Sequence, residues 1–61
     1  MDFTPRQLEA LELVAQGYSD PEIAERLRLR RRVTTLMLHR LAMQLGATSL
    51  AEFRQKARGI T

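Results

Sequence analysis

Arginines at positions 28, 30, 31 and 32 carry the most concentrated chemistry in this sequence, and Leu29 is the one apolar residue among them. A guanidinium group binds phosphate oxygens through two parallel N–H groups. Arg30, Arg31 and Arg32 also stand where a helix is expected to begin, and the free N–H groups of a first helical turn favour phosphate. Cations at that end interact unfavourably with the helix dipole, and each lowers the stability of the helix by about 0.3–1 kcal/mol. A bound polyanion would offset this cost, so the run favours a nucleic-acid contact over a solvated charged loop.

The stretch after these arginines predicts a helix over about residues 31–45, with one buried and one exposed face. The residues expected to be buried fall within one sector of a helical wheel and are Thr34, Leu38, Leu41, Ala42 and Leu45. The outward face follows the same helical spacing and comprises Arg32, Thr35, Leu36, His39, Arg40 and Met43. Gly46 follows as the expected left-handed terminator of this helix.

Side chains on the outward face have the chemistry needed to read DNA bases. Thr35 and Leu36 are suited to thymine methyl groups, and His39 is suited to donating to a purine edge. The surrounding arginines are suited to phosphates, which position a protein on the duplex. The predicted DNA-binding residues are therefore Arg28, Arg30, Arg31, Arg32, Thr35, Leu36, His39 and Arg40. Two alternatives to base contacts stay open. His39 is an exposed histidine without a partner, or Leu36, Met37 and Met43 pack in the core or in a protein interface.

The length of the chain and the distribution of its charge indicate a single domain with an anionic partner. A chain of 61 residues has room for a single domain, and its net charge is +3. Residues 1–25 hold one base and six acids, a sum of −5, whereas residues 26–61 hold nine bases and one acid, a sum of +8. Such asymmetry is typical of a protein with an anionic partner.

The residue types present indicate neither catalysis nor insertion into a membrane. The chain has no cysteine and one histidine, so we predict no catalytic residue, no metal site and no cofactor. No apolar run approaches the length of about 20 residues that a membrane span needs, and no signal-peptide pattern opens the chain. We therefore expect a cytoplasmic protein that is not an enzyme.

Start and stop signals predict four helices over about residues 5–16, 20–27, 31–45 and 50–58, in one domain spanning residues 1–61. Three of these helices begin with a capping box, and the boxes pair Thr4 with Gln7, Ser19 with Glu22 and Ser49 with Glu52. Only the helix that starts near Arg31 lacks a cap. Gly17 and Gly59 are expected to end the first and last helices. The fold class is therefore all-α.

Apolar spacing also predicts which side chains of the other helices are buried. The expected core residues are Leu8, Leu11, Val14, Ala15, Ile23, Ala24, Leu27, Leu50, Ala51 and Ala57. Phe53 is assigned either to this core or to an interface between proteins. The second and third helices, joined by the arginine-rich turn, have the organisation of a helix-turn-helix unit.

Two long motifs carry a resemblance to a known family. The segment FTPRQLEALELVAQGYSDPEIAERLRL resembles the start of the LuxR-type (GerE-type) DNA-binding domain, which commonly reads LTPREhEVLxLhAxGxSNKEIAxxLxI, where h is apolar. The segment LGATSLAEF resembles LGVxSRAEL near the end of that domain. The resemblance runs without a gap from Phe3 to about Ala57. It implies a four-helix domain of bacterial transcriptional regulators, whose third helix lies in the major groove and whose fourth often mediates dimerisation.

The departures from the family pattern fall on the start of the third helix. Where the family commonly has S-E-K-T-V-K-x-H, positions 30–37 read RRRVTTLM. The usual cap is replaced by Arg30, and the usual acid by Arg31. A common phosphate-contacting threonine is replaced by Val33, the core valine by Thr34, and a common lysine by Thr35. The resemblance thus implies DNA binding in general, whereas the family's usual target sequence does not carry over.

Three readings of the function follow, and the first is favoured. The chain binds double-stranded DNA and regulates transcription, pairing as a homodimer through its last helix. Alternatively, it is a protein-interaction module that antagonises or pairs with a transcription regulator or RNA polymerase, as the apolar residues Val33, Leu36 and Met37 suggest. Region 4 of a sigma factor has a similar helix pair, but the ending LGATSLAEF argues against it. The chain is either a stand-alone regulator or the C-terminal domain of a longer one.

Overall fold

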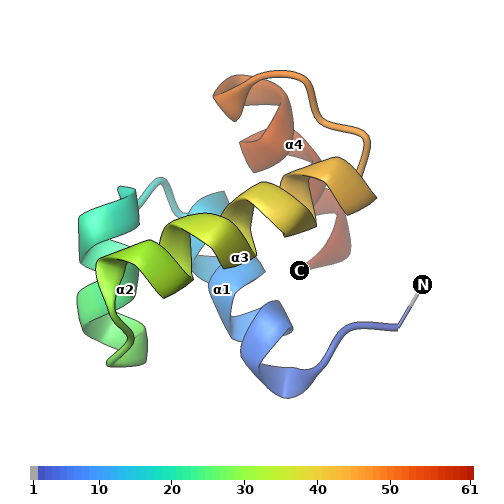
Figure 1. Cartoon of the computed structure of the whole chain (residues 1–61). Coiled ribbons are helices and arrows are strands. Elements are labelled where there is room, and N and C mark those ends of the chain that lie inside the picture. Colours follow the sequence, from blue (N-terminus) through green and yellow to red (C-terminus); the bar gives the residue numbers. More distant parts are fainter. Residues whose placement is uncertain (1) are drawn as a thin grey trace.

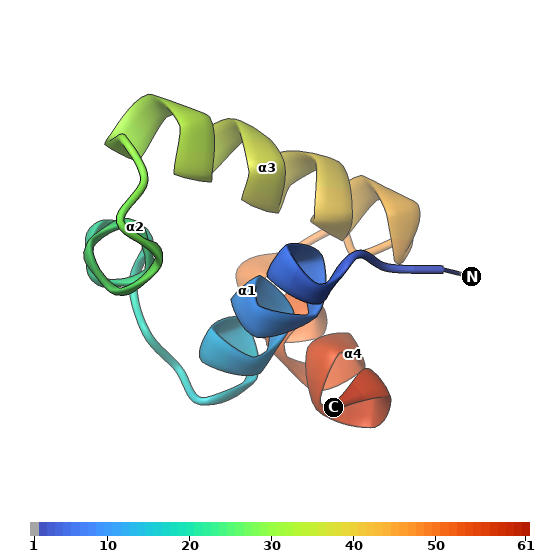
Figure 2. The same ribbon diagram turned by 90° about the horizontal axis from the view of Figure 1, so that it is seen from below.

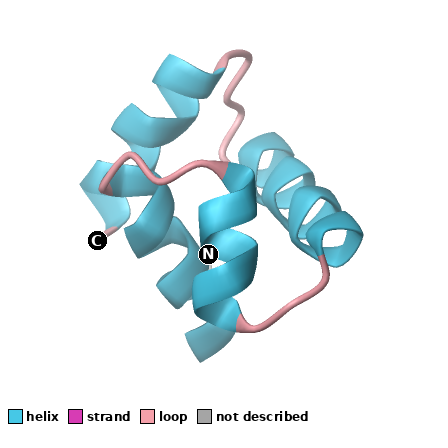
Figure 3. Ribbon diagram, turned by 90° about the vertical axis from the view of Figure 1, so that its left-hand side faces the viewer, coloured by secondary structure: helices cyan, strands magenta, loops and turns pink. Residues whose placement is uncertain are grey.

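The computed structural model describes residues 2–61, and all regular structure in this range is helical. The helices are α1 (Pro5–Ala15), α2 (Asp20–Leu27), α3 (Arg31–Gln44) and α4 (Leu50–Ile60). Figure 1 shows α3 crossing in front of α1, with α2 at one end of it. Short loops connect the helices (Figure 3). The fold is therefore all-α, as the sequence predicted.

Packing between helices leaves one long side of α3 free. α1 packs most extensively against α4, α2 packs against α3, and α1 also contacts α2. Seen from below, α3 runs along one side of the molecule, whereas α1 and α4 lie together on the other side (Figure 2). The outer face of α3 is consequently a surface of the molecule rather than part of its core.

The core draws side chains from every helix, and the stripe predicted for α3 is confirmed. Thr34, Leu38 and Leu41 are buried, and Ala42 and Leu45 are half-buried. In α2 the predicted residues are likewise buried, and they are Ile23, Ala24 and Leu27. The full apolar core comprises Ala10, Leu11, Val14, Ile23, Ala24, Leu27, Leu38, Leu41, Phe53 and Ala57.

Two helices are rotated about their axes relative to the prediction. In α1, Ala10 is fully buried whereas Leu8, expected inside, is 39% exposed. In α4, Leu50 is 57% exposed and Ala51 is exposed, while Phe53 occupies the core at 5% exposure. A small residue at an interface lets two helices approach closely, and Ala10 of α1 and Ala57 of α4 are both fully buried in helices that pack together. Close packing of α1 on α4 therefore decided which residues are inside.

The starts of α1 and α2 agree fully with the predicted capping boxes, whereas the start and the end of α4 differ from the prediction. Both capping boxes that precede α1 and α2 are complete. Before α4, the Ser49 hydroxyl accepts from the Glu52 N–H at 3.1 Å, but Glu52 Oε1 accepts from the N–H of Thr48 at 2.9 Å instead of that of Ser49. Ser49 has a φ of −147°, which turns its own N–H away from the carboxylate. Gly59 does not end α4, because the helix continues to Ile60.

Candidate nucleic-acid interface

The turn between α2 and α3 is fixed by a backbone motif centred on Arg28. The N–H of Arg28 donates to the Glu25 carbonyl at 3.2 Å, and the N–H of Leu29 donates to the Ala24 carbonyl at 2.9 Å. This is a Schellman ending, which needs a left-handed residue, and Arg28 supplies it with φ 56° and ψ 42°. Leu29, the one apolar residue among the arginines, is half-buried against the core, whereas Arg28 is exposed. The motif therefore directs one arginine outward at the end of α2.

The other helices that end in this motif place glycine at the left-handed position. Gly17 follows α1 with a φ of 90°, and Gly46 follows α3 with a φ of 71°, as predicted. Arg28 is the one non-glycine residue with a positive φ in residues 2–61. A left-handed conformation costs a residue with a side chain roughly 1–2 kcal/mol. Stability is thus lost at the residue where the basic turn begins, a feature that the sequence reading did not identify.

Arg6 supports the same turn from α1. Its Nη1 donates to the carbonyl of Leu27, the last residue of α2, at 3.4 Å. The guanidinium carbon of Arg26 in α2 lies 4.1 Å from the centre of the Tyr18 ring. Both arginines are exposed, but each makes a contact within the domain that no local pattern reveals.

The start of α3 lacks a side-chain cap, as the sequence predicted. Arg30 is the N-cap residue, its side chain makes no capping hydrogen bond, and the first turn of this helix contains no acid. The Arg30 carbonyl accepts from the Thr34 N–H at 3.0 Å and from the Thr34 hydroxyl at 3.1 Å. Free N–H groups and guanidinium groups are therefore concentrated at one helix end.

All eight residues predicted to bind DNA are exposed, and they are Arg28, Arg30, Arg31, Arg32, Thr35, Leu36, His39 and Arg40. Five of them line one shallow hollow on the outer face of α3, and these are Arg31, Arg32, Thr35, Leu36 and His39. Arg28 and Arg30 lie in the preceding turn, and Arg40 lies further along α3. The structure thus brings these side chains to one end and one face of α3.

Exposed apolar side chains share the outer surface of α3. Val33 is 50% exposed, Leu36 is 51% exposed and Met43 is 67% exposed, whereas Met37 is half-buried against the core. Leu36 and Met43 lie opposite the buried stripe, since residues seven apart return to the same side of a helix. The surface therefore combines cationic and apolar side chains on the same exposed face of α3.

Glu22 is the acid whose environment changes its titration. The Ser19 N–H donates to its carboxylate at 2.9 Å, and the Ser19 hydroxyl donates at the same distance. These bonds, the backbone bond above all, lower the pKa of Glu22 below its ordinary value of 4.5, and Arg26 adds to the effect. Glu22 is thus held as a carboxylate at the start of α2.

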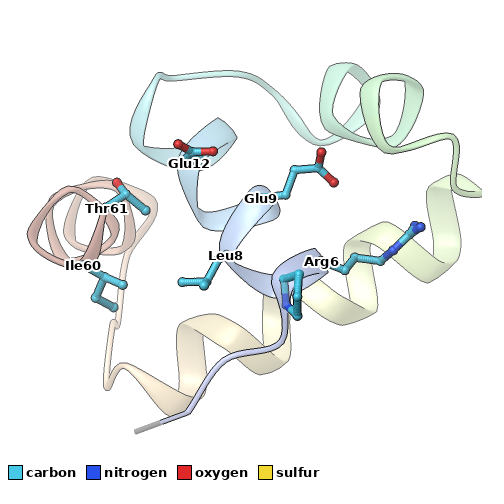
Figure 4. A pocket seen from close by; sticks show the side chains of 7 residues that line it. Arg6, Leu8, Glu9, Glu12, Ile60 and Thr61 are labelled. Atoms are coloured by element: carbon cyan, nitrogen blue, oxygen red, sulfur yellow. The ribbon is translucent and has the colours of Figure 1, made fainter.

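An acidic hollow lies between α1 and the end of α4 (Figure 4). In this view Leu8 points from α1 toward Ile60 of α4, whereas Glu9 extends away from them; Glu12 and Arg6 of α1 also line the hollow. A neighbouring hollow shares Leu8 and Ile60 and adds Phe3. Carboxylates repel phosphates, so this surface is unsuited to nucleic acid.

No group of His, Cys, Asp or Glu in residues 2–61 is arranged to hold a metal ion. In the same range, no helix is both long enough and apolar enough to cross a membrane.

Comparison with known proteins identifies the family. Searches of curated proteins and of solved structures gave no match. The family model described as "Bacterial regulatory proteins, luxR family" matches residues 1–57. It covers all of α1, α2 and α3, the basic turn, and α4 as far as Ala57. The family is one of DNA-binding regulatory domains rather than of enzymes. The chain therefore belongs to the luxR family of bacterial regulatory proteins, and its four helices form the family's helix-turn-helix domain.

Proposed function

We propose that this domain binds double-stranded DNA sequence-specifically in the cytoplasm and regulates transcription, with α3 in the major groove. The observation that carries the proposal is the concentration of exposed arginines and base-reading side chains at the start of α3. An α-helix with its side chains is about 10–12 Å wide, and the major groove is about 12 Å wide. The uncovered side of α3 is thus able to enter the groove without rearrangement of the other helices.

The energetics of the turn support an anionic ligand. Arg28 is left-handed where glycine is favoured, Arg30 leaves the helix uncapped, and Arg31 opposes the helix dipole. Each feature lowers the stability of the free domain. Phosphate oxygens would compensate for the uncapped N–H groups and for the repulsion between neighbouring guanidinium groups. Together, these features indicate that the turn is adapted to a polyanion rather than to stability.

The side chains divide into two roles on the duplex. Arginines of the turn and Arg40 border the helix and contact phosphates, which fix the register of the protein. Thr35, Leu36 and His39 lie on the outer face and contact base edges. The affinity therefore depends mainly on the arginines, and the choice of sequence depends mainly on the outer face.

Salt dependence of binding tests the proposal. Four phosphate contacts, from Arg30, Arg31, Arg32 and Arg40, should lower log K with log salt at a slope of roughly −3 to −5 per monomer. A labelled random duplex pool is titrated at several salt concentrations. Absence of binding at the lowest salt would refute the proposal.

We also propose that two copies pair through α4 on adjacent half-sites. Leu50, at the start of α4, is 57% exposed and is the most exposed apolar side chain of this helix. A dimer would match the symmetry of a palindromic operator. Phe53 takes no part in this pairing, because it lies in the core.

Protein interaction is the second candidate function, supported by Val33, Leu36 and Met43 on the outer face of α3. In this alternative the same helix contacts a transcription regulator or RNA polymerase through these apolar side chains. The two candidates differ in one measurement. Binding to DNA with a steep salt slope favours the first, and the absence of DNA binding leaves the second.

A further inference from the structure

We infer that α3 recognises the C5 methyl groups of thymine through the hollow lined by Thr35 and Leu36, so that each half-site contains T·A pairs at this position. The inference rests on the proposed DNA binding and names the bases that the outer face selects. It follows from the position of the hollow on the outer face of α3 and from the exposed apolar side chain of Leu36 among its lining residues.

The hollow is lined by one apolar side chain, two arginines, a threonine and a histidine. Leu36 is 51% exposed in the second turn of α3, and the exposed Thr35, which carries a methyl group, also lines the hollow. Arg31 and Arg32 line the hollow on the side of the helix start, and His39 lines it one turn further along. An apolar group therefore faces outward between two cations and a histidine.

The major groove offers one apolar group, the thymine methyl. Guanine, cytosine and adenine present hydrogen-bond donors and acceptors at the corresponding edges. A leucine placed against those edges would remove water from polar groups without replacing their hydrogen bonds, which is unfavourable. Leu36 thus selects thymine in two ways, by favourable contact with the methyl group and by rejection of the other bases.

The spacing of the two residues predicts how many thymines are read. Thr35 and Leu36 are consecutive and rise by about 1.5 Å along the helix while turning by about 100°. Their Cα atoms are about 3.8 Å apart, which is close to the separation of about 3.4 Å between adjacent base pairs, so the two side chains fit neighbouring pairs. A pair of consecutive T·A steps fits this arrangement better than an isolated one.

The test removes single methyl groups from the DNA. Duplexes bound by the wild-type domain are selected from a random pool, and each thymine of the preferred half-site is replaced in turn by uracil. At one or two neighbouring positions, affinity should fall by about three- to fivefold, the factor expected from losing burial of one methyl-sized group. Leu36→Ala should abolish this sensitivity to uracil at one of those positions.

Val33→Ala is the matched control, because Val33 is equally exposed on α3 but does not line the hollow. This variant should keep the full sensitivity to uracil. DNA binding without any uracil effect, or a preferred half-site without thymine, would overturn the inference and leave the proposed function standing. Failure to bind any duplex at low salt would overturn both.

Discussion

At the scale of single residues, Thr34 holds a polar group in the core. It is fully buried, while the neighbouring Val33 is half exposed. The family resemblance leads one to expect valine at position 34, so the apolar residue has moved by one position and out of the core. The Thr34 hydroxyl is satisfied by the Arg30 carbonyl, which already accepts the Thr34 N–H. This second bond is therefore dispensable for the helix.

Thr34→Val should stabilise the domain by about 1 kcal/mol, because it replaces a buried hydroxyl with a methyl group. The melting temperature should rise by roughly 4–8 °C for a chain of this size. Thr35→Val is the control, since Thr35 is exposed on the next position and the change should leave the melting temperature nearly the same. A lower melting temperature for Thr34→Val would show that the hydroxyl is needed to hold the start of α3.

Glu22 makes stability depend on pH in a predictable direction. Its pKa is lowered in the folded state by the bonds from Ser19, so its contribution is present above about pH 4.5 and is lost as the pH falls through the folded pKa. Glu22→Gln keeps an acceptor for Ser19, as Gln7 does for Thr4, but removes the charge. Wild type should melt above the variant at pH 7, and the difference in melting temperature should shrink as the pH falls below 4.5. A constant difference across this range would exclude the linkage.

At the scale of elements, the N-terminus of α3 has features that lower the stability of the domain but suit the proposed DNA binding. It combines an uncapped start with cations in the first turn, and it follows a left-handed arginine. The starts of α1, α2 and α4 all have a serine or threonine cap. The contrast within one small domain indicates that α3 begins in a way suited to its ligand.

Arg30→Ser combined with Arg31→Glu should stabilise the domain by about 1–2 kcal/mol, since it adds a cap and a favourable acid. The same variant should bind DNA at least about tenfold more weakly, because it loses the phosphate contacts of two arginines and places a carboxylate, which repels phosphate, at one of the two positions. Thermal melts and DNA titrations of one preparation give both quantities.

A variant with the same change of charge elsewhere provides the control. Gln55→Glu with Lys56→Glu also lowers the net charge by three, on exposed side chains of α4. Its DNA affinity should fall less than that of the α3 variant. Equal losses would mean that net charge rather than the position of the arginines governs binding. A lower melting temperature for the α3 variant would contradict the account of the helix terminus.

At the scale of the whole molecule, cationic and anionic groups lie on different surfaces. The arginines of the turn and of α3 are exposed, whereas Glu9 and Glu12 line the hollow between α1 and α4. In the proposed complex, in which α3 enters the major groove, we expect the acids of α1 to lie away from the phosphates. We therefore expect charge to orient the domain on the duplex.

Association through α4 is tested with Leu50→Asp, which should weaken a dimer without unfolding the monomer, since Leu50 is largely exposed. Sedimentation of the free and DNA-bound protein at several concentrations measures the effect. Gln55→Asp introduces the same acid at another exposed position of α4 and should leave association unchanged. Phe53→Asp is unsuitable, because a charge at this buried position would destabilise the fold. If Leu50→Asp and wild type sediment as identical monomers and bind DNA without cooperativity, the dimer proposal is wrong.

Local sequence determined the helices, two complete capping boxes, the uncapped start of α3 and its buried stripe. These features depend on residues within about one helical turn of each other, so spacing alone predicts them. The exposure of the predicted DNA-binding residues within α3 followed from the same periodicity.

Tertiary structure alone decided the rotation of α1 and α4 and the support of the basic turn. A helical wheel defines a broad apolar face, but the shape of the partner helix selects the part that is buried, and so Ala10 replaced Leu8 and Phe53 replaced Leu50 in the core. The bond from Arg6 to the Leu27 carbonyl joins residues 21 positions apart. No local pattern encodes such a contact, because it exists only once α1 and α2 have packed together.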